Sequence, residues 1–315
     1  MSNDTIRAMD DRYAGVLLGL ACGDALGGPV EFRHRDAIAA EFPDGVREFI
    51  GGGWLNLDPG EVTDDTQQTL ILADALTATG LDLERLAEGL IGWYRSNPKD
   101  IGNTTRIALE ALAAGTPPLA AGEVALQARG AEGAASNGAV MRCAPVALRF
   151  RRDPQRLVSA SLDSARITHA EERSAWACVA VNQAIVHLLE GGTIDAAAEA
   201  AVAGIPNDDV RTTVLEAAAR ERDAVGARGF VLDTIGASFW SLAHGTSARD
   251  AIELAVAFGD DADSTGAVTG ALACATYGRA ALPESWTNRV QFRDRLASEA
   301  ARLLTLADRD EKGKT

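Results

Sequence analysis

The chain has 315 residues, of which 47% are hydrophobic and 24% charged, and its formal net charge is −15 at pH 7. This composition is typical of a soluble globular protein with a large core, and the negative charge disfavours non-specific binding to nucleic acid. A small phosphate-bearing ligand is still compatible with it, because a bound divalent cation reverses the local sign of the charge.

No segment approaches the roughly 18–20 uninterrupted apolar residues of a membrane span, and the polar, acidic N-terminal stretch does not resemble a secretory signal. We therefore expect a cytoplasmic protein that binds neither membranes nor nucleic acid. The four cysteines, Cys22, Cys143, Cys178 and Cys274, are scattered and form no CxxC pair. This pattern favours buried, reduced thiols over a zinc site or a disulfide framework.

Apolar residues recur at steps of three and four along most of the chain, which predicts helices. The clearest helical runs, in chain order, are 13–26, 66–80, 82–96, 104–115, 174–192, 209–222 and 247–259. One short strand is predicted over 46–50, and the longest loops over about 27–62, 96–103 and 116–142. The sequence therefore predicts a compact all-α bundle with one domain over 1–307 and a disordered tail over 308–315.

Two stretches place adjacent carboxylates directly before helical runs. The first is Thr63-Asp64-Asp65-Thr66, and the second runs from Asp260 to Ser264 and includes Asp261 and Asp263. Capping of a helix start explains one acid in each stretch but not neighbouring acids, which repel each other unless water or a cation offsets their charge. If the two helix starts face each other, their oxygens suit a hard cation such as Mg²⁺, Mn²⁺ or Ca²⁺.

Four other positions are candidates for a functional role, and at several of them an ordinary structural role is equally compatible with the sequence. Glu31 follows a Gly-Gly-Pro turn whose glycines allow either close helix packing or the approach of a ligand to backbone. Asp100 lies in a polar turn before a helix. Residues 136–148 place Ser, Asn and Gly before an apolar helix, where free N–H groups suit a phosphate but an ordinary cap is equally compatible. His169 lies at a predicted helix start, where it either caps the helix or contacts a ligand.

Six motifs occur in the order, and at roughly the spacing, found in the ADP-ribosylglycohydrolases, the family of the dinitrogenase-reductase-activating glycohydrolase. They are GDALGGPVEF (23–32), TDDT (63–66), NPKDIGNTTRIAL (97–109), SNGAVMRCAPVAL (136–148), ITHAEERSAWACVAV (167–181) and GDDADSTGAVTGAL (259–272). The chain resembles this family over about residues 11–280. The resemblance implies an orthogonal all-α bundle with two Mg²⁺ or Mn²⁺ ions in a cleft that binds ADP-ribose.

The resemblance also implies roles for individual residues. The implied metal ligands are Thr63, Asp64, Asp65, Asp261, Asp263 and Ser264; the implied catalytic residues are Glu31, Asp100 and Asp65; the implied substrate-binding residues are Asn137, Gly138, Met141 and His169. Asp260 stands where the family usually has Gly or Asn, and Ser264 where it has Thr. Since Ser keeps the hydroxyl ligand, we expect the site to be preserved.

The implied activity is metal-dependent removal of ADP-ribose from a modified protein or a small conjugate, with arginine-linked ADP-ribose favoured. Serine-linked ADP-ribose and O-acetyl-ADP-ribose are alternative substrates, and a catalytically inactive ADP-ribose-binding member is an alternative function. A Mg²⁺-dependent prenyl-diphosphate enzyme is a further alternative, because such enzymes are also all-α with two acidic motifs. The stretch DDTQQ, however, matches their DDxxD motif only in part.

Overall fold

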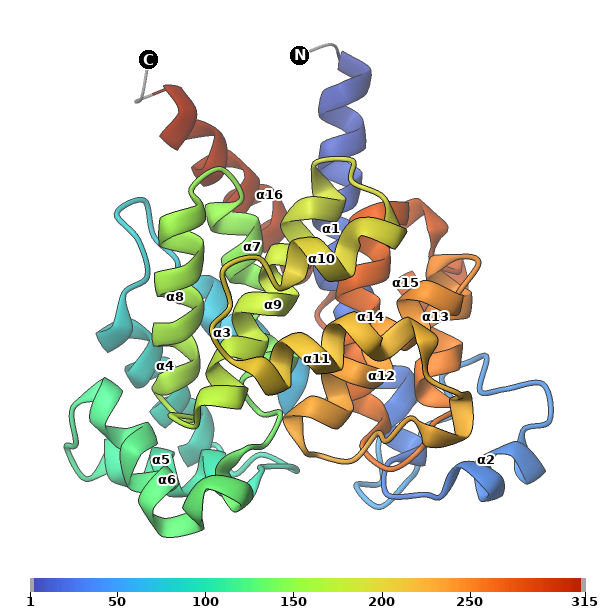
Figure 1. Ribbon diagram of the computed structural model, residues 1–315, viewed down its shortest axis with the longest axis horizontal. Coiled ribbons are helices and arrows are strands. Elements are labelled where there is room, and N and C mark those ends of the chain that lie inside the picture. Colours follow the sequence, from blue (N-terminus) through green and yellow to red (C-terminus); the bar gives the residue numbers. More distant parts are fainter. Residues whose placement is uncertain (1–2, 313–315) are drawn as a thin grey trace.

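Helices dominate the computed structural model (Figure 1), which describes the backbone of residues 3–312 and the side chains of residues 8–309. The α-helices are α1 (Asn3–Gly27), α2 (Arg35–Glu41), α3 (Asp64–Ala75), α4 (Leu83–Arg95), α5 (Asn103–Ala113), α6 (Pro118–Ala134), α7 (Ala144–Phe150), α8 (Pro154–Arg166), α9 (Glu172–Leu189), α10 (Ala197–Ala201), α11 (Asp208–Glu216), α12 (Val231–His244), α13 (Ala248–Val256), α14 (Ala262–Tyr277), α15 (Glu284–Thr287) and α16 (Arg293–Lys312). Short 3₁₀ helices are η1 (Gly28–Val30), η2 (Val140–Arg142), η3 (Ile194–Ala196), η4 (Ala217–Ala219), η5 (Arg222–Ala224) and η6 (Arg279–Ala281). The predicted all-α class is confirmed.

Three predicted elements are wrong. The predicted loop over 27–62 contains η1 and the seven-residue helix α2. The segment 46–50 is not a strand, and β pairing within the described residues is limited to isolated bridges. Val46 and Phe49 are nevertheless buried, so this irregular segment packs its apolar side chains on the core. The predicted loop over 116–142 contains α6, which has a kink at Gly130 and lacks the strong apolar period that identifies a helix from sequence.

The C-terminal helix α16 was not among the predicted helices. It continues to Lys312, through most of the segment 308–315 where a disordered tail was expected. Asp308 accepts a hydrogen bond of 2.8 Å from Arg151 Nη2, which connects this part of α16 to the end of α7. Residues 313–315 lie outside the described residues, and the single-domain assignment over 1–307 stays a prediction.

The centre of the fold is a contact between the backbones of α1 and α14, which lie side by side in Figure 1. Glycines recur at every fourth residue of α1, and a methyl group on Gly23 would lie 2.0 Å from the carbonyl oxygen of Gly266 in α14. One turn away, a methyl group on Gly270 would lie 2.0 Å from the carbonyl oxygen of Gly19. The two backbones can approach this closely because both helices carry glycine where they touch.

One segment, Ala8–Val30, is long and apolar enough by length and composition to cross a membrane. The expectation that no segment approaches a span therefore fails for α1 on this measure. The most apolar part of the segment is, however, completely buried by the other helices, as a core helix would be.

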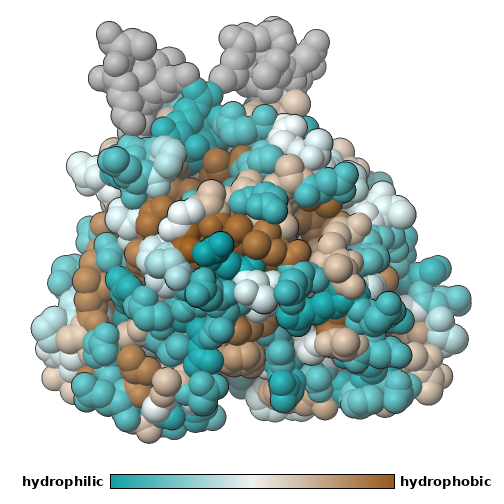
Figure 2. All heavy atoms as spheres, in the orientation of Figure 1, coloured by the Kyte–Doolittle hydropathy of each residue, from teal (hydrophilic) through white to brown (hydrophobic). Residues whose placement is uncertain are grey.

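The polarity of the surface and the burial of the cysteines are as expected from the composition of the chain. Polar side chains cover most of the face shown in Figure 2, and apolar residues form a band across its upper half. All four cysteines are buried and free of disulfide bonds, as predicted.

Replacing Gly23 with alanine is expected to destabilise the protein by about 1–3 kcal/mol, because the added methyl group meets a backbone carbonyl that cannot rotate away. Gly92→Ala in α4 is the matched control, since nothing lies within 4 Å of a methyl group added there. That change should stabilise the helix by up to about 1 kcal/mol. Urea unfolding followed by circular dichroism measures both, and unchanged stability of Gly23→Ala would contradict the backbone contact.

Candidate active site

The two acidic motifs meet at the N-terminal ends of α3 and α14. Thr63 is the N-cap of α3, and Asp64 and Asp65 lie in its first turn, while Asp261 is the N-cap of α14 and Asp263 lies in its first turn. Neither N-cap side chain accepts a hydrogen bond from the helix amides, so capping does not explain these acids. The carboxylates are instead held at the positive ends of two helix dipoles, which stabilise negative charge.

A cleft of about 180 Å³ brings most of the predicted site residues together. Its lining includes Glu31, Asp64, Asp65, Asp100, Asn137, Gly138, Met141, His169, Asp261, Asp263 and Ser264. Thr63 does not line the cleft, but its Oγ1 atom lies 3.2 Å from Oδ2 of Asp65. The structure therefore supports the grouping of these residues, while their individual roles stay predictions.

The carboxylates form two groups, and within each group the oxygens lie within 4.8 Å of one another. One group consists of Asp24, Asp65 and Asp263, and the other of Glu31, Asp100 and Asp263. Asp263 belongs to both groups. Carboxylate oxygens gathered this closely are the ligands that hard divalent cations prefer.

Asp65 gives the most direct sign that a cation fits here. Its Oδ1 atom is buried and has no hydrogen-bond partner among the described residues. Leaving a buried acceptor without a partner is costly, and more so for a charged group. Burial and the nearby carboxylate of Asp24 raise the pKa of Asp65 well above its ordinary value. A divalent cation would satisfy this oxygen, so the residues present fit a metal.

Asp24 is a site residue that the sequence analysis missed. It is fully buried near the end of α1, and it accepts hydrogen bonds from the backbone N–H groups of Thr63 (2.9 Å) and Thr66 (3.1 Å). The hydroxyl groups of the same threonines donate to it at 2.9 and 2.5 Å. Burial raises the pKa of Asp24 to about 6, although these hydrogen bonds lower it. With four donors already in place, Asp24 anchors the start of α3 more readily than it binds a metal.

Arg142 is a second residue that the sequence analysis missed. Its buried guanidinium donates from Nη1 to Gln68 Oε1 (2.6 Å) and to the Gly138 carbonyl (2.7 Å), and from Nη2 to Thr168 Oγ1 (2.7 Å). Gln68 in turn donates to Asp64 Oδ2 at 3.1 Å. Burial lowers the pKa of Arg142 to about 10, so the group is still charged at neutral pH. One buried cation thus connects the acidic start of α3 to the loop that contains Gly138.

His169 is neutral and faces the cleft. Its ring nitrogens lie 2.8 Å from Thr168 Oγ1 and 3.0 Å from Ser136 Oγ, and burial lowers its pKa to about 3. The alternative that His169 caps the following helix is wrong, because Glu171 is the N-cap of α9 and accepts two of its backbone N–H groups. His169 therefore shapes the cleft wall without adding charge.

Glu31 lies on the edge of the cleft and is held by an aromatic side chain. Trp54 Nε1 donates to Glu31 Oε2 at 2.6 Å. Burial raises the pKa of Glu31 to about 8, and the carboxylates of Asp261 and Asp100 add to the effect. Burial also raises the pKa of Asp100. In both groups burial disfavours the charged carboxylate, and a nearby cation would offset this effect.

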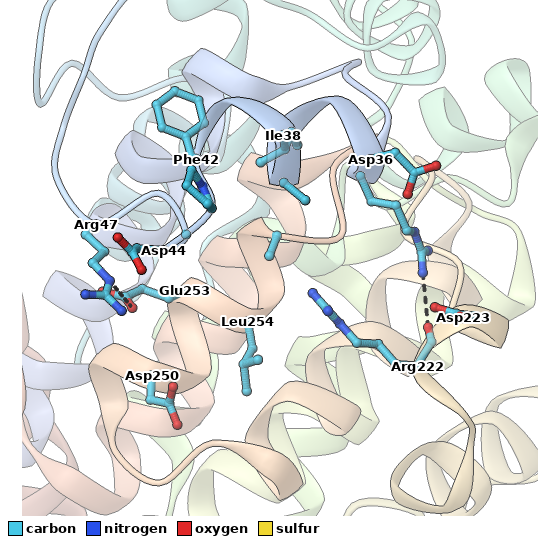
Figure 3. Close-up of a pocket in the computed structure, with 15 residues that line it drawn as sticks. Asp36, Ile38, Phe42, Asp44, Arg47, Arg222, Asp223, Asp250, Glu253 and Leu254 are labelled. Atoms are coloured by element: carbon cyan, nitrogen blue, oxygen red, sulfur yellow. Dashed lines mark hydrogen bonds and ion pairs between the residues drawn. The ribbon is translucent and has the colours of Figure 1, made fainter.

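A different cavity, of about 340 Å³, lies between α2, α13 and η5 (Figure 3). Arg35 donates to the Arg222 carbonyl at 3.1 Å, and Arg47 pairs with Glu253 at 3.8 Å. No implied catalytic, metal-binding or substrate-binding residue lines this cavity. The chemistry of the acidic motifs therefore belongs to the smaller cleft.

Residues 4–313 match the family described as ADP-ribosylglycohydrolase. The chain belongs to the ADP-ribosylglycohydrolase family. Family membership confirms the resemblance seen in the sequence and makes the protein a hydrolase of ADP-ribosyl bonds. It leaves the prenyl-diphosphate alternative without support.

Relatives of this ADP-ribosylglycohydrolase match over most of their length. The ADP-ribosylarginine hydrolase Tri1 of Serratia proteamaculans is 33% identical over 96% of this chain and 81% of its own. The ADP-ribosyl-[dinitrogen reductase] glycohydrolase of Rhodospirillum rubrum is 34% identical over 96% of this chain and 99% of its own. A solved structure titled "ADP-ribosylglycohydrolase-related protein complex" superimposes with a TM-score of 0.84 at 33% identity, covering 96% of this chain and 99% of that one.

Asp260, where the family usually has Gly or Asn, has a structural explanation. Its φ of 51° lies in the left-handed region, where Gly, Asn and Asp are tolerated best. Its carbonyl accepts a hydrogen bond of 2.6 Å from the backbone N–H of Phe32, and its own N–H donates to the Arg33 carbonyl at 2.9 Å. Asp260 does not line the cleft, so the residue joins two loops and is not itself placed to bind a metal.

Without metal, the protein is expected to lose stability as the pH rises from about 5 to 8. The pKa of Glu31 is raised from 4.5 to about 8 in the folded state. Over this window the folded state therefore binds more protons than the unfolded state, so stability falls with rising pH. Melting temperatures in EDTA at several pH values measure the effect.

Glu31→Gln should flatten this dependence, whereas Asp36→Asn, which removes one exposed charge on α2, should leave it unchanged. Added Mg²⁺ should stabilise the wild-type protein more at pH 8 than at pH 5. A melting temperature that rises with pH in EDTA would contradict the assignment of a buried, protonated Glu31.

Proposed function

We propose that this ADP-ribosylglycohydrolase removes ADP-ribose from arginine side chains of proteins with the help of two divalent cations, Mg²⁺ or Mn²⁺. The observation that carries the proposal is the cluster of carboxylates around the partnerless Oδ1 atom of Asp65. Arginine is favoured as the linkage because one relative is named for ADP-ribosylarginine and because an acidic cleft suits a cationic guanidinium.

The cations would be held by Thr63, Asp64, Asp65, Asp261, Asp263 and Ser264, all of which offer oxygen ligands. When bound, two such ions would orient the ribose hydroxyls and activate the attacking water by lowering its pKa. Asp24 keeps the start of α3 in place through Thr63 and Thr66, and so positions these ligands without binding the metal itself.

The reaction breaks the bond between the anomeric carbon of the ribose and the guanidino nitrogen. Water gives its hydroxyl group to the carbon, and the nitrogen finally gains the proton. Positive charge builds on the ribose in the transition state, and the cleft carboxylates stabilise it. Glu31 or Asp100 transfers the proton from the attacking water to the leaving nitrogen, since both line the cleft. Asp65 helps to orient the water.

The diphosphate of ADP-ribose would lie against the loop of Asn137, Gly138 and Met141. A methyl group on Gly138 would lie 2.9 Å from His169 Cε1, so glycine keeps the loop backbone against the cleft wall. The backbone N–H groups of Asn137 and Met141 already donate to the carbonyls of Gly229 and Asn137. The N–H of Gly138 is therefore the group proposed to meet a phosphate oxygen, and His169 adds a polar edge.

The first experiment is release of ADP-ribose from an arginine-ADP-ribosylated protein in Mg²⁺, in Mn²⁺ and in EDTA. We expect metal-dependent release that EDTA abolishes. If arginine-linked substrate is not cleaved, serine-linked ADP-ribose and O-acetyl-ADP-ribose are tested in the same way. Binding of ADP-ribose without hydrolysis of any of the three would show an inactive binder and overturn the proposal.

Neighbouring acids provide a matched pair of variants. Asp261→Asn should lower kcat/KM by at least about 100-fold, because even the partners of metal ligands commonly contribute 10- to 100-fold. Asp260→Asn should stay within about threefold of wild type, since Asn also tolerates the left-handed backbone and the side chain lies outside the cleft lining. Steady-state kinetics and calorimetric Mn²⁺ titration measure both, and equal effects of the two changes would refute the ligand assignment.

A further inference from the structure

Two aromatic side chains are exposed beside the catalytic carboxylates. Phe32 is 67% exposed and Trp54 is 53% exposed, and their ring centroids lie 5.3 Å apart at an interplanar angle of 45°. Phe32 follows Glu31 in the chain and lines the cleft, and Trp54 contacts both residues. Single exposed apolar residues are common, but a pair at the edge of a cleft indicates a binding surface.

The backbone holds this pair in a preset position. Phe32 has a φ of 59°, which is unfavourable for a bulky residue and is maintained by its N–H donating to the Asp260 carbonyl. Gly53 has a φ of 69°, and a methyl group there would lie 2.9 Å from Pro29 Cα, so the loop that carries Trp54 lies directly on η1. Backbone strain of this kind clusters at ligand sites, and here it coincides with a position on the cleft lining.

The charges of the cleft are arranged unevenly. Among the described residues that line it, Arg129 of α6 is the one with a positive charge. Phe32 instead follows Glu31 in the chain, and the Glu31 carboxylate lies close to those of Asp100 and Asp263. Figure 1 shows α6 on the left of the lower edge of the molecule and α2, which Phe32 precedes, on the right. In Figure 2 the lower edge is indented between these two sides.

This polarity matches an ADP-ribosylated arginine. Its diphosphate is anionic and its guanidinium, on the other side of the ribose, is cationic. A guanidinium stacks on an aromatic face and is stabilised by the negative potential of that face, particularly when carboxylates are close. A neutral leaving group such as serine gains no comparable attraction.

We propose that the ring of Phe32, supported by Trp54, is the subsite for the guanidinium of the modified arginine and makes the enzyme selective for arginine-linked over serine-linked ADP-ribose. This inference rests on the proposed function. It adds the residue that recognises the protein side of the bond, whereas the metal ligands and the Gly138 loop serve the ADP-ribose side.

Phe32→Leu tests the inference, because it keeps an apolar side chain at the same backbone position and removes the aromatic face. We expect kcat/KM for arginine-ADP-ribosylated protein to fall by about 3- to 30-fold. The affinity for free ADP-ribose should stay within about twofold of wild type, and Phe32→Tyr should restore the activity. Phe292→Leu is the matched control, since Phe292 is also exposed and has a φ of 60° but does not line the cleft.

Three other results would contradict the inference, and each has a different meaning. An equal loss of ADP-ribose affinity in Phe32→Leu would place the ring against the ADP-ribose or give it a structural role. Full arginine-linked activity in the same variant would show that the ring is not used. If the wild-type enzyme does not cleave arginine-linked substrate at all, the proposed function fails and the inference fails with it.

Discussion

The backbone contact between α1 and α14 determines where the acidic groups of the site lie. Because Gly23 and Gly266 allow the two helices to touch, Asp24 at the end of α1 comes within reach of Asp263 at the start of α14. Both carboxylates are thus carried by rigid helices in the core, and not by mobile loops. A site built on such elements keeps its ligand oxygens in place before any ion or substrate arrives.

Hydrogen bonds extend this arrangement from two helices to the whole site. Asp24 anchors the start of α3 through Thr63 and Thr66, and Arg142 connects α3 to the loop of Gly138. These contacts join segments that are far apart in the sequence. As a result, the loss of any one of these hydrogen bonds would shift the positions of carboxylates on another helix.

The same arrangement brings buried carboxylates so close together that their negative charges repel, and a bound cation would offset this repulsion. Burial and neighbouring carboxylates raise the pKa values of Asp64, Asp65 and Asp263. So many acids in one cleft are stable only if protons or cations offset their charge. Metal binding would therefore support both the fold and the chemistry, whereas the aromatic and acidic side near Phe32 offers a favourable place for a positive charge on the substrate.

Local patterns in the sequence were enough to predict the all-α class, several of the long helices and the acidic residues that line the cleft. They did not predict α6, α8, α12 or α16. Helical periodicity is local, and the acids at 63–66 and 260–264 stand out within a few residues. Tertiary structure decided the roles of Asp24 and Arg142, because each is defined by partners far along the chain. It also left 46–50 as an irregular segment without a β partner and placed Phe32 beside Trp54. Contacts between distant segments leave no local pattern, since they depend on how α1 and α14 bring those segments together.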